Sequence, residues 1–329
     1  MTKAEPLFAF QPSYGRTRAI DQAIRTALND SVVRVIDEAV RQGFVRAVVP
    51  TGWKHALLDT ERAPPQLWAC YHDLVQAILR GDAEAVTGLA AELVARRPDR
   101  AGRPGTVLTI SEGDLGAVDA ARYRAIIDSD VEQPLDLRPV EPTEAHRIRG
   151  LVAEARGLLT EADPRLLDEI DTLGHQIVLA TDASGGFGGA ATVFLWGGVV
   201  LNPARVPDCV TLVEGLAHET AHALLFGMTL GADLTTNDPA QRYSSPLRQD
   251  PRPMEGIVHA TYVLARMNYA LSALRKATGL SESEQALIAG KLDRNRASYE
   301  AGLGVVLAHA RFTPAGACIF DACREAMAN

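Results

Sequence analysis

The chain of 329 residues is 47% hydrophobic and 22% charged, a balance typical of a globular protein with a sizeable core. Its net charge of −8 argues against a nucleic-acid partner, because phosphates require a basic surface. No apolar run is long enough to span a bilayer and the first residues lack the pattern of a signal peptide, so we expect no membrane association and a cytoplasmic location. The four cysteines are few and scattered, which favours reduced thiols over a disulfide framework.

Hydrophobic periodicity predicts helices along most of the first half of the chain. These helices are expected at 16–41, 67–94 and 115–127, followed by two pieces within 143–173. The stretch at 128–142 contains three prolines and reads as a connector. It predicts a boundary between an N-terminal helical region, residues 1–142, and a second region, residues 143–329.

Short segments rich in β-branched and aromatic residues follow at 175–180, 190–196 and 199–202. Glycine-rich turns separate them, so we expect a small antiparallel sheet. Four further helices are expected after the sheet, at 213–226, 251–274, 281–308 and 314–327. The predicted fold is therefore α+β, mostly helical, with a small antiparallel sheet preceding the helix at 213–226.

That helix contains His218-Glu219-x-x-His222, an H-E-x-x-H pattern, and Thr211-x-x-Glu214 is a possible capping box at its start. Residues four apart lie one turn above each other on the same helix face, so both imidazoles can bind one metal ion. Glu219 lies beside them, where a carboxylate can move a proton or orient a ligand. The alternative is an amphipathic helix with two unrelated histidines, and we favour the metal site.

A polar stripe on the helix expected from Pro251 supplies candidates for a third ligand. Its members recur at steps of three or four residues: Arg252, Glu255, His259, Tyr262 and Arg266. Burying unpaired charges is costly, so such a stripe faces either solvent or a metal with an anionic ligand. Glu255 would complete a two-His-one-carboxylate set and His259 a three-imidazole set, and spacing alone leaves both open.

Arg248 and Arg252 add a second kind of chemistry to the predicted site. A guanidinium grips a carboxylate through two parallel hydrogen bonds, so two arginines near one pocket favour a small carboxylate or diacid ligand. The alternative is a pair of exposed arginines in a polar loop, which applies most to Arg248.

Three motifs occur in order: His218-Glu-x-x-His222, Ser245-Pro-Leu-Arg-Gln-Asp-Pro-Arg-Pro253 and Gly256-Ile-Val-His-Ala-x-Tyr262. Together they resemble the H-E-x-x-H-type peptide β-hydroxylases, over roughly the second half of the chain. Leu247 departs from the family pattern, in which a Trp is usual. The resemblance implies Fe(II) and 2-oxoglutarate as cofactors, and hydroxylation of a side-chain β-carbon in a ribosomally made precursor peptide.

The resemblance also implies roles for individual residues. Position 259 is commonly His in the family whereas position 255 varies, which implies His218, His222 and His259 as iron ligands with Glu255 in reserve. Arg252 is implied as the partner of the distal carboxylate of 2-oxoglutarate.

Further residues have secondary places in this scheme. Arg248 is the less favoured partner of the cosubstrate carboxylate. Glu219 would orient a ligand or the substrate from outside the ligand set, and Tyr262 would also lie in the outer part of the site.

Two other classes of function are compatible with the sequence. A zinc-dependent metallopeptidase would use Glu219 as general base and Glu255 as third ligand. A non-catalytic peptide-binding protein would hold a structural metal, although structural zinc is usually held by four protein ligands and the sequence offers three.

Overall fold

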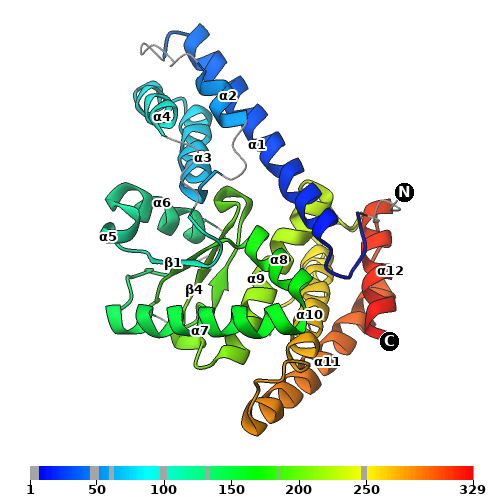
Figure 1. Cartoon of the computed structure of the whole chain (residues 1–329). Coiled ribbons are helices and arrows are strands. Elements are labelled where there is room, and N and C mark those ends of the chain that lie inside the picture. Colours follow the sequence, from blue (N-terminus) through cyan, green and yellow to red (C-terminus); the bar gives the residue numbers. More distant parts are fainter. Residues whose placement is uncertain are drawn as a thin grey trace, which may run out of the picture. The chain divides into compact units, whose positions relative to one another are not determined.

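The computed structural model describes residues 7–44, 52–58, 63–96, 102–129, 134–183, 185–245 and 250–328. The chain is 67% helical with one small four-stranded sheet, which confirms the predicted mostly helical α+β class (Figure 1). The chain forms two compact units, each built from segments that are separated in the sequence. Unit 1 comprises Met1–Ile20, Arg147–Leu173 and Arg205–Asn329, and unit 2 comprises Asp21–His146 and Gly174–Ala204.

The predicted boundary at residue 142 lies close to the passage from unit 2 to unit 1 after His146. Each unit nevertheless draws on separate stretches of the chain. The sheet segment at 174–204 groups with the N-terminal helices, whereas the helix that carries the H-E-x-x-H motif belongs to unit 1.

Unit 2 contains the sheet, whose strands are β1 (Thr106–Thr109), β2 (Gln176–Leu179), β3 (Gly189–Ala190) and β4 (Gly198–Leu201). The strand order is β1-β2-β4-β3, with β1–β2 and β2–β4 parallel and β3–β4 antiparallel. The sheet is therefore mixed: the predicted antiparallel arrangement is wrong for β2 and β4, and β1 was not predicted. Every residue of β2 and β4 is buried, the pattern of strands covered on both faces, which parallel pairing requires.

The helices of unit 2 are α2 (Trp53–Leu58), α3 (Pro65–Arg80), α4 (Ala83–Ala95), α5 (Glu112–Leu115) and α6 (Ala117–Asp128). The unit also includes α1 (Tyr14–Arg41) from Asp21 onward. The single helix predicted at 67–94 is interrupted between α3 and α4. Gly81 adopts a left-handed φ of 70°, which ends α3, and the Asp82 side chain accepts a hydrogen bond from Ala85 N to begin α4.

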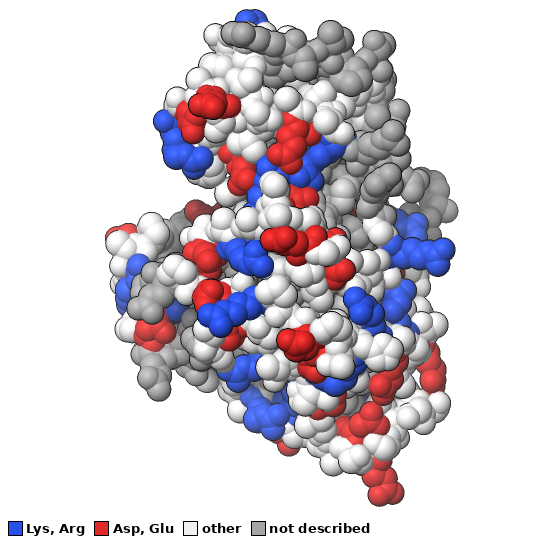
Figure 2. Space-filling model, turned by 90° about the vertical axis from the view of Figure 1, so that its left-hand side faces the viewer, with Lys and Arg blue, Asp and Glu red and all other residues white. Residues whose placement is uncertain are grey.

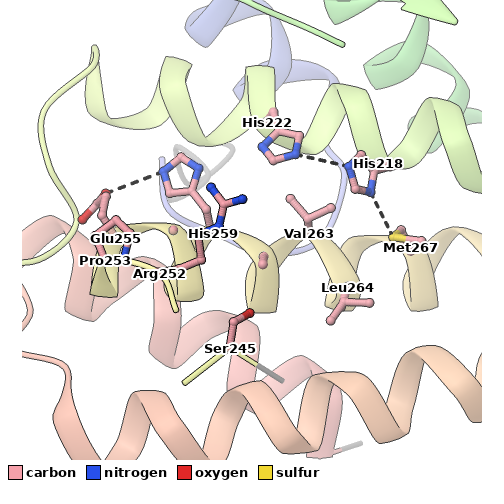
Figure 3. A pocket seen from close by; sticks show the side chains of 12 residues that line it. His218, His222, Ser245, Arg252, Pro253, Glu255, His259, Val263, Leu264 and Met267 are labelled. Atoms are coloured by element: carbon pink, nitrogen blue, oxygen red, sulfur yellow. Dashed lines mark hydrogen bonds and ion pairs between the residues drawn. The ribbon is translucent and has the colours of Figure 1, made fainter. Parts of the chain in front are cut away.

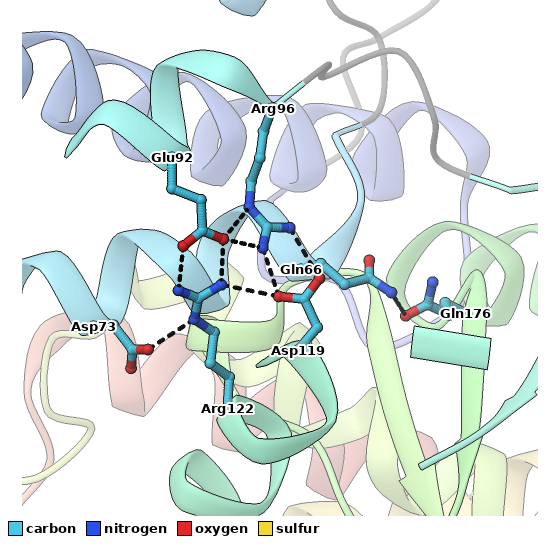
Figure 4. A network of polar contacts seen from close by, with 7 residues as sticks. All are labelled: Gln66, Asp73, Glu92, Arg96, Asp119, Arg122 and Gln176. Atoms are coloured by element: carbon cyan, nitrogen blue, oxygen red, sulfur yellow. Dashed lines mark hydrogen bonds and ion pairs between the residues drawn. The ribbon is translucent and has the colours of Figure 1, made fainter. Parts of the chain in front are cut away.

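A polar network ties α3, α4 and α6 together in unit 2 (Figure 4). The Arg122 guanidinium donates to Glu92 at 2.7 Å, to Asp73 at 2.8 Å and to Asp119 at 3.0 Å. Arg96 donates to Glu92 and Asp119, both at 2.6 Å. The hydrogen bonds from Arg122 and then Arg96 outweigh burial and lower the pKa of Glu92 to about 2.

The helices of unit 1 are α8 (Pro164–Leu173), α9 (Cys209–Thr229), α10 (Met254–Leu274), α11 (Glu282–His309) and α12 (Pro314–Ala328). The unit also includes α7 (Pro142–Ala162) from Arg147 onward. Helix α10 packs against both α9 and α11. The two helices α10 and α11 lie close together where Thr261 meets Gly302. A Cβ at Gly302 would lie 2.4 Å from Thr261 Oγ1, so this approach requires glycine.

The first turn of α9 differs from the prediction. The capping box at Thr211-x-x-Glu214 does not form, because Asp208 caps the helix by accepting a hydrogen bond from Thr211 N at 2.7 Å. Glu214 instead accepts hydrogen bonds from Lys291 at 2.5 Å and Asn295 at 2.7 Å, which join α9 to α11.

A buried ion cluster fixes α10 within unit 1. Glu169 of α8 accepts hydrogen bonds from Arg16 of α1 and Arg266 of α10, and the three side chains are at most 3% exposed. The Arg266 guanidinium also lies 5.1 Å from the ring of Phe10 and 5.4 Å from that of Tyr269. The N-terminal segment is thereby attached to the helix that carries His259.

Charges of both signs are interspersed over the face drawn in Figure 2, among the residues described there. No helix in the described ranges combines the length and the apolar composition needed to cross a membrane.

Removal of the carboxylate at the centre of the ion cluster should destabilise unit 1. Glu169→Ala leaves two arginines buried without their shared counter-charge, and we expect a loss of about 3–5 kcal/mol in the free energy of unfolding. Urea denaturation of the full chain measures this loss. Glu154→Ala, at an exposed position of α7, serves as control and should change little. Equal stability of the Glu169 and Glu154 variants would contradict the central place of the cluster.

Candidate functional site

The H-E-x-x-H histidines open onto a cavity of about 660 Å³ in unit 1 (Figure 3). Helix α9 supplies His218 and His222, and α10 supplies most of the opposite wall. The lining residues are His218, His222, Ser245, Arg252, Pro253, Glu255, Gly256, His259, Ala260, Val263, Leu264 and Met267. The structure thus brings together most of the residues that the sequence singles out.

The two histidines of α9 are arranged as ligands of one ion would be. Their Nε2 atoms lie 3.4 Å apart and their ring centroids 5.0 Å apart. Two imidazole nitrogens bound at about 2.1 Å to one tetrahedral metal ion lie about 3.4 Å apart, so this pair fits a metal. Burial, and then the neighbouring His218 and His259, lower the pKa of His222 to about 3, so this imidazole is neutral at pH 7, as a metal ligand must be.

His259 lies in the same cavity but farther from the pair. Its ring centroid is 6.2 Å from that of His222, and its Nε2 lies 3.6 Å from Glu255 Oε1. In Figure 3 the His259 ring stands between Glu255 and His222. Within the described part of the chain, no three His, Cys, Asp or Glu side chains already form a complete metal-binding group. The α9 pair is therefore preformed, whereas His259 has to turn toward it to complete a set of three.

Glu255 is engaged by the loop that precedes α10. Its carboxylate accepts hydrogen bonds from Leu234 N at 2.9 Å, Thr235 N at 3.0 Å and Thr235 Oγ1 at 2.8 Å. Burial raises the pKa of Glu255, but the nearby His259 and the hydrogen bonds from the loop outweigh it, so the pKa is lowered overall. Both oxygens are in use, so Glu255 is placed to hold His259 and the loop rather than to bind an ion directly.

The loop itself is tightly packed at this point. Thr313 N donates to Leu234 O at 2.9 Å, and a Cβ on Gly316 would lie 2.0 Å from that same oxygen. Only glycine permits α12 to begin so close to the loop backbone. The loop backbone that binds the Glu255 carboxylate is consequently held in place by its contacts with Thr313 and Gly316.

Arg252 lies outside α10, not on it. The helix was predicted from Pro251 but begins at Met254, because each proline favours an extended conformation in the residue before it. Arg252 instead forms an antiparallel bridge with Tyr243, with backbone hydrogen bonds of 2.9 and 3.0 Å. Its guanidinium points into the cavity toward the histidines (Figure 3), with Nε 2.7 Å from Asp250 Oδ2. Arg248 falls outside the described residues.

Two predicted residues are placed outside the cavity lining. Glu219 is buried, which raises its pKa to about 8, and its Oε1 lies 4.0 Å from His218 Nε2. Tyr262 is 2% exposed and packs edge-on against Phe10 with ring centroids 5.9 Å apart. Viewed along α10, Tyr262 and Val263 lie on opposite sides of His259. Val263 lines the cavity, whereas Tyr262 belongs to the core.

The apolar part of the wall was not predicted. Ala260, Val263, Leu264 and Met267 continue the cavity along α10, and Met267 Sδ lies 3.4 Å from His218 Nδ1. Their positions one and two turns beyond Gly256 and His259 are the signal that could have identified them. Ser245, at the other rim, was part of the sequence motif but had no assigned role.

Comparison of the chain with known proteins adds no relative: neither a family model nor a curated protein matches it. The geometry of the cavity therefore carries the functional argument.

Loss of the Glu255 carboxylate should loosen the loop at 234–235. Glu255→Ala leaves two backbone amides without their charged acceptor, and we expect their hydrogen exchange to accelerate by about tenfold or more. Exchange measured by mass spectrometry on the intact chain tests this. Asp238→Ala, which removes a carboxylate bonded to Ala240 N in the same loop, should leave these amides protected. Unchanged exchange at 234 and 235 in the Glu255 variant would show that the anchor lies elsewhere.

Proposed function

We propose that this protein is an Fe(II)- and 2-oxoglutarate-dependent oxygenase. Its substrate would be a ribosomally made precursor peptide, hydroxylated at a side-chain β-carbon in the cytoplasm. The observation that carries the proposal is a guanidinium, that of Arg252, in the same cavity as three imidazoles (Figure 3). The resemblance of the ordered motifs supports the same class of reaction.

His218, His222 and His259 would hold the iron, the first two through the nitrogens that lie 3.4 Å apart. Iron with 2-oxoglutarate and O₂ supplies an oxidant that can replace a C–H bond by a C–OH bond. Three imidazoles leave positions open for the cosubstrate, which a fully closed protein ligand set would not.

His259 is the better third ligand because of what Glu255 already does. A ligating histidine usually donates its other ring N–H to a carboxylate, which fixes the ring orientation. Glu255 is placed for that role by its 3.6 Å contact with His259 and by its bonds to the 234–235 loop. As a ligand it would have to abandon those bonds.

Arg252 would hold the distal carboxylate of 2-oxoglutarate. A planar guanidinium forms two parallel hydrogen bonds with a carboxylate, which suits the distal end of this diacid. Asp250 Oδ2 lies 2.7 Å from Arg252 Nε, so this ion pair occupies one edge of the guanidinium.

The remaining space suits a substrate side chain. A cavity of about 660 Å³ is large for a five-carbon diacid alone, and Val263, Leu264 and Met267 form an apolar wall beside the histidines. These side chains would exclude water from the reacting carbon.

A zinc peptidase is the second candidate, favoured by one contact. Glu219 Oε1 lies 4.0 Å from His218 Nε2, near enough to the ion position to act on a bound water. This class would take Glu255 as third ligand.

Metal analysis distinguishes the two ligand sets. His259→Ala should weaken Fe(II) binding about tenfold or more, whereas Glu255→Gln, which keeps the shape of the side chain, should retain the metal with a smaller loss. Anaerobic reconstitution of the full chain followed by iron determination measures both. Full iron content in the His259 variant together with its loss in the Glu255 variant would overturn the assignment.

Cosubstrate turnover tests the class of reaction. The anaerobically purified protein, supplied with Fe(II), O₂ and 2-oxoglutarate, should release succinate and CO₂ while a precursor peptide encoded beside its gene gains one oxygen atom. Arg252→Met should raise the KM for 2-oxoglutarate about ten- to a hundredfold, because it removes a charged hydrogen-bond partner but keeps the backbone bridge to Tyr243. Arg242→Met, in the same loop, is the matched control.

The rival functions give different results in the same assay. A peptidase would cleave the peptide with zinc and leave 2-oxoglutarate intact. A non-catalytic binding protein would neither cleave nor oxidise it, with or without the histidines of α9.

A further inference from the structure

Met267 contacts the side of His218 that faces away from His222. Its Sδ lies 3.4 Å from His218 Nδ1, while His218 Nε2 lies 3.4 Å from His222 Nε2 (Figure 3). Met267 belongs to α10, two turns beyond His259. One helix therefore carries both a candidate ligand and the residue that touches a ligand of the other helix.

The chemistry of the thioether favours one of the two ring nitrogens of His218 as the site of the proton. A neutral imidazole has one N–H donor and one lone-pair acceptor, and a thioether sulfur can accept but not donate. The contact is a hydrogen bond only when the proton is on Nδ1. The Nε2 lone pair is then directed at the space shared with His222, where a metal ligand needs it.

We infer that Met267 is a positioning residue that holds His218 in the Nδ1–H tautomer and so prepares its Nε2 atom to bind the metal. The inference rests on the proposed function. In this role the thioether accepts the hydrogen bond from the ring N–H that does not face the metal, which a carboxylate or a backbone carbonyl usually accepts from a metal-bound histidine. Since sulfur is neutral and a weak acceptor, it fixes the tautomer without adding negative charge behind the ligand.

Tautomer state can be measured without any metal. The full chain, labelled with ¹⁵N at histidine and kept metal-free, reports by long-range proton–nitrogen NMR which ring nitrogen of His218 is protonated; His218→Gln identifies the signal. We expect the Nδ1–H form in the wild type and a shift to the Nε2–H form in Met267→Leu, which keeps the side-chain volume but removes the acceptor. An Nε2–H form in the wild type would overturn the inference.

Metal affinity gives the second measurement. Competition with a chelating dye should show Co(II) bound about tenfold more weakly by Met267→Leu, and Met267→Gln should restore binding because its carbonyl oxygen accepts the same hydrogen bond. Met228→Leu, at a buried position of α9 outside the cavity lining, controls for the loss of a thioether. A merely structural role would make the Gln variant the worse of the two.

The two failures are distinguishable. Equal Co(II) affinity of the wild type and Met267→Leu would overturn the role of Met267 and leave the proposed function standing. An Nδ1–H tautomer in a wild-type protein that binds no divalent metal would count against the proposed function alone.

Discussion

The separation of two imidazole nitrogens on α9 is the constraint on which the rest of the site depends. His218 Nε2 and His222 Nε2 lie 3.4 Å apart, close enough to repel unless a proton or a metal ion stands between them. Helical spacing places both rings on one face, and the packing of α10 encloses them. The buried cluster of Glu169 with Arg266 in turn fixes α10, so a contact remote from the cavity determines where its wall stands.

Local signals in the sequence specify most helices, because their starts and stops are local chemistry. A capping box between Ser281 and Glu284 begins α11 where a helix was predicted at 281–308, and Pro164 begins α8, the second of the two helical pieces predicted within 143–173. The sheet is harder, because parallel pairing is a long-range choice. No local signal near β1 indicates that Thr106–Thr109 pairs with Gln176–Leu179 across a helical region. The second predicted strand, at 190–196, becomes a short 3₁₀ helix at Val193–Leu195.

In the candidate site, too, some residues could be predicted from local sequence spacing, whereas others depend on contacts between distant segments. His218, His222, Glu255 and His259 follow from motif spacing and meet in one cavity. Tyr262 lies on the same predicted polar stripe but faces Phe10. Residues at steps of three and four do not fall on one line of the helix surface, so the outermost residues of the stripe point away from the cavity. The 234–235 loop could not be predicted, because it contacts Glu255 from a separate segment of the chain. Met267 lies on α10 at helical spacing from His259, but its contact with His218 depends on how α9 packs against α10.

Arg252 and the three histidines are the observations from which we propose a cosubstrate-dependent oxygenase and not a hydrolase, and the most direct test of this proposal requires no peptide. Fe(II) added anaerobically to the full chain, followed by 2-oxoglutarate, should produce the visible charge-transfer absorption of an iron chelate, saturating at one equivalent and lost in His222→Ala. Iron bound at the same stoichiometry, with no absorption band at any concentration of 2-oxoglutarate, would contradict the proposed chemistry.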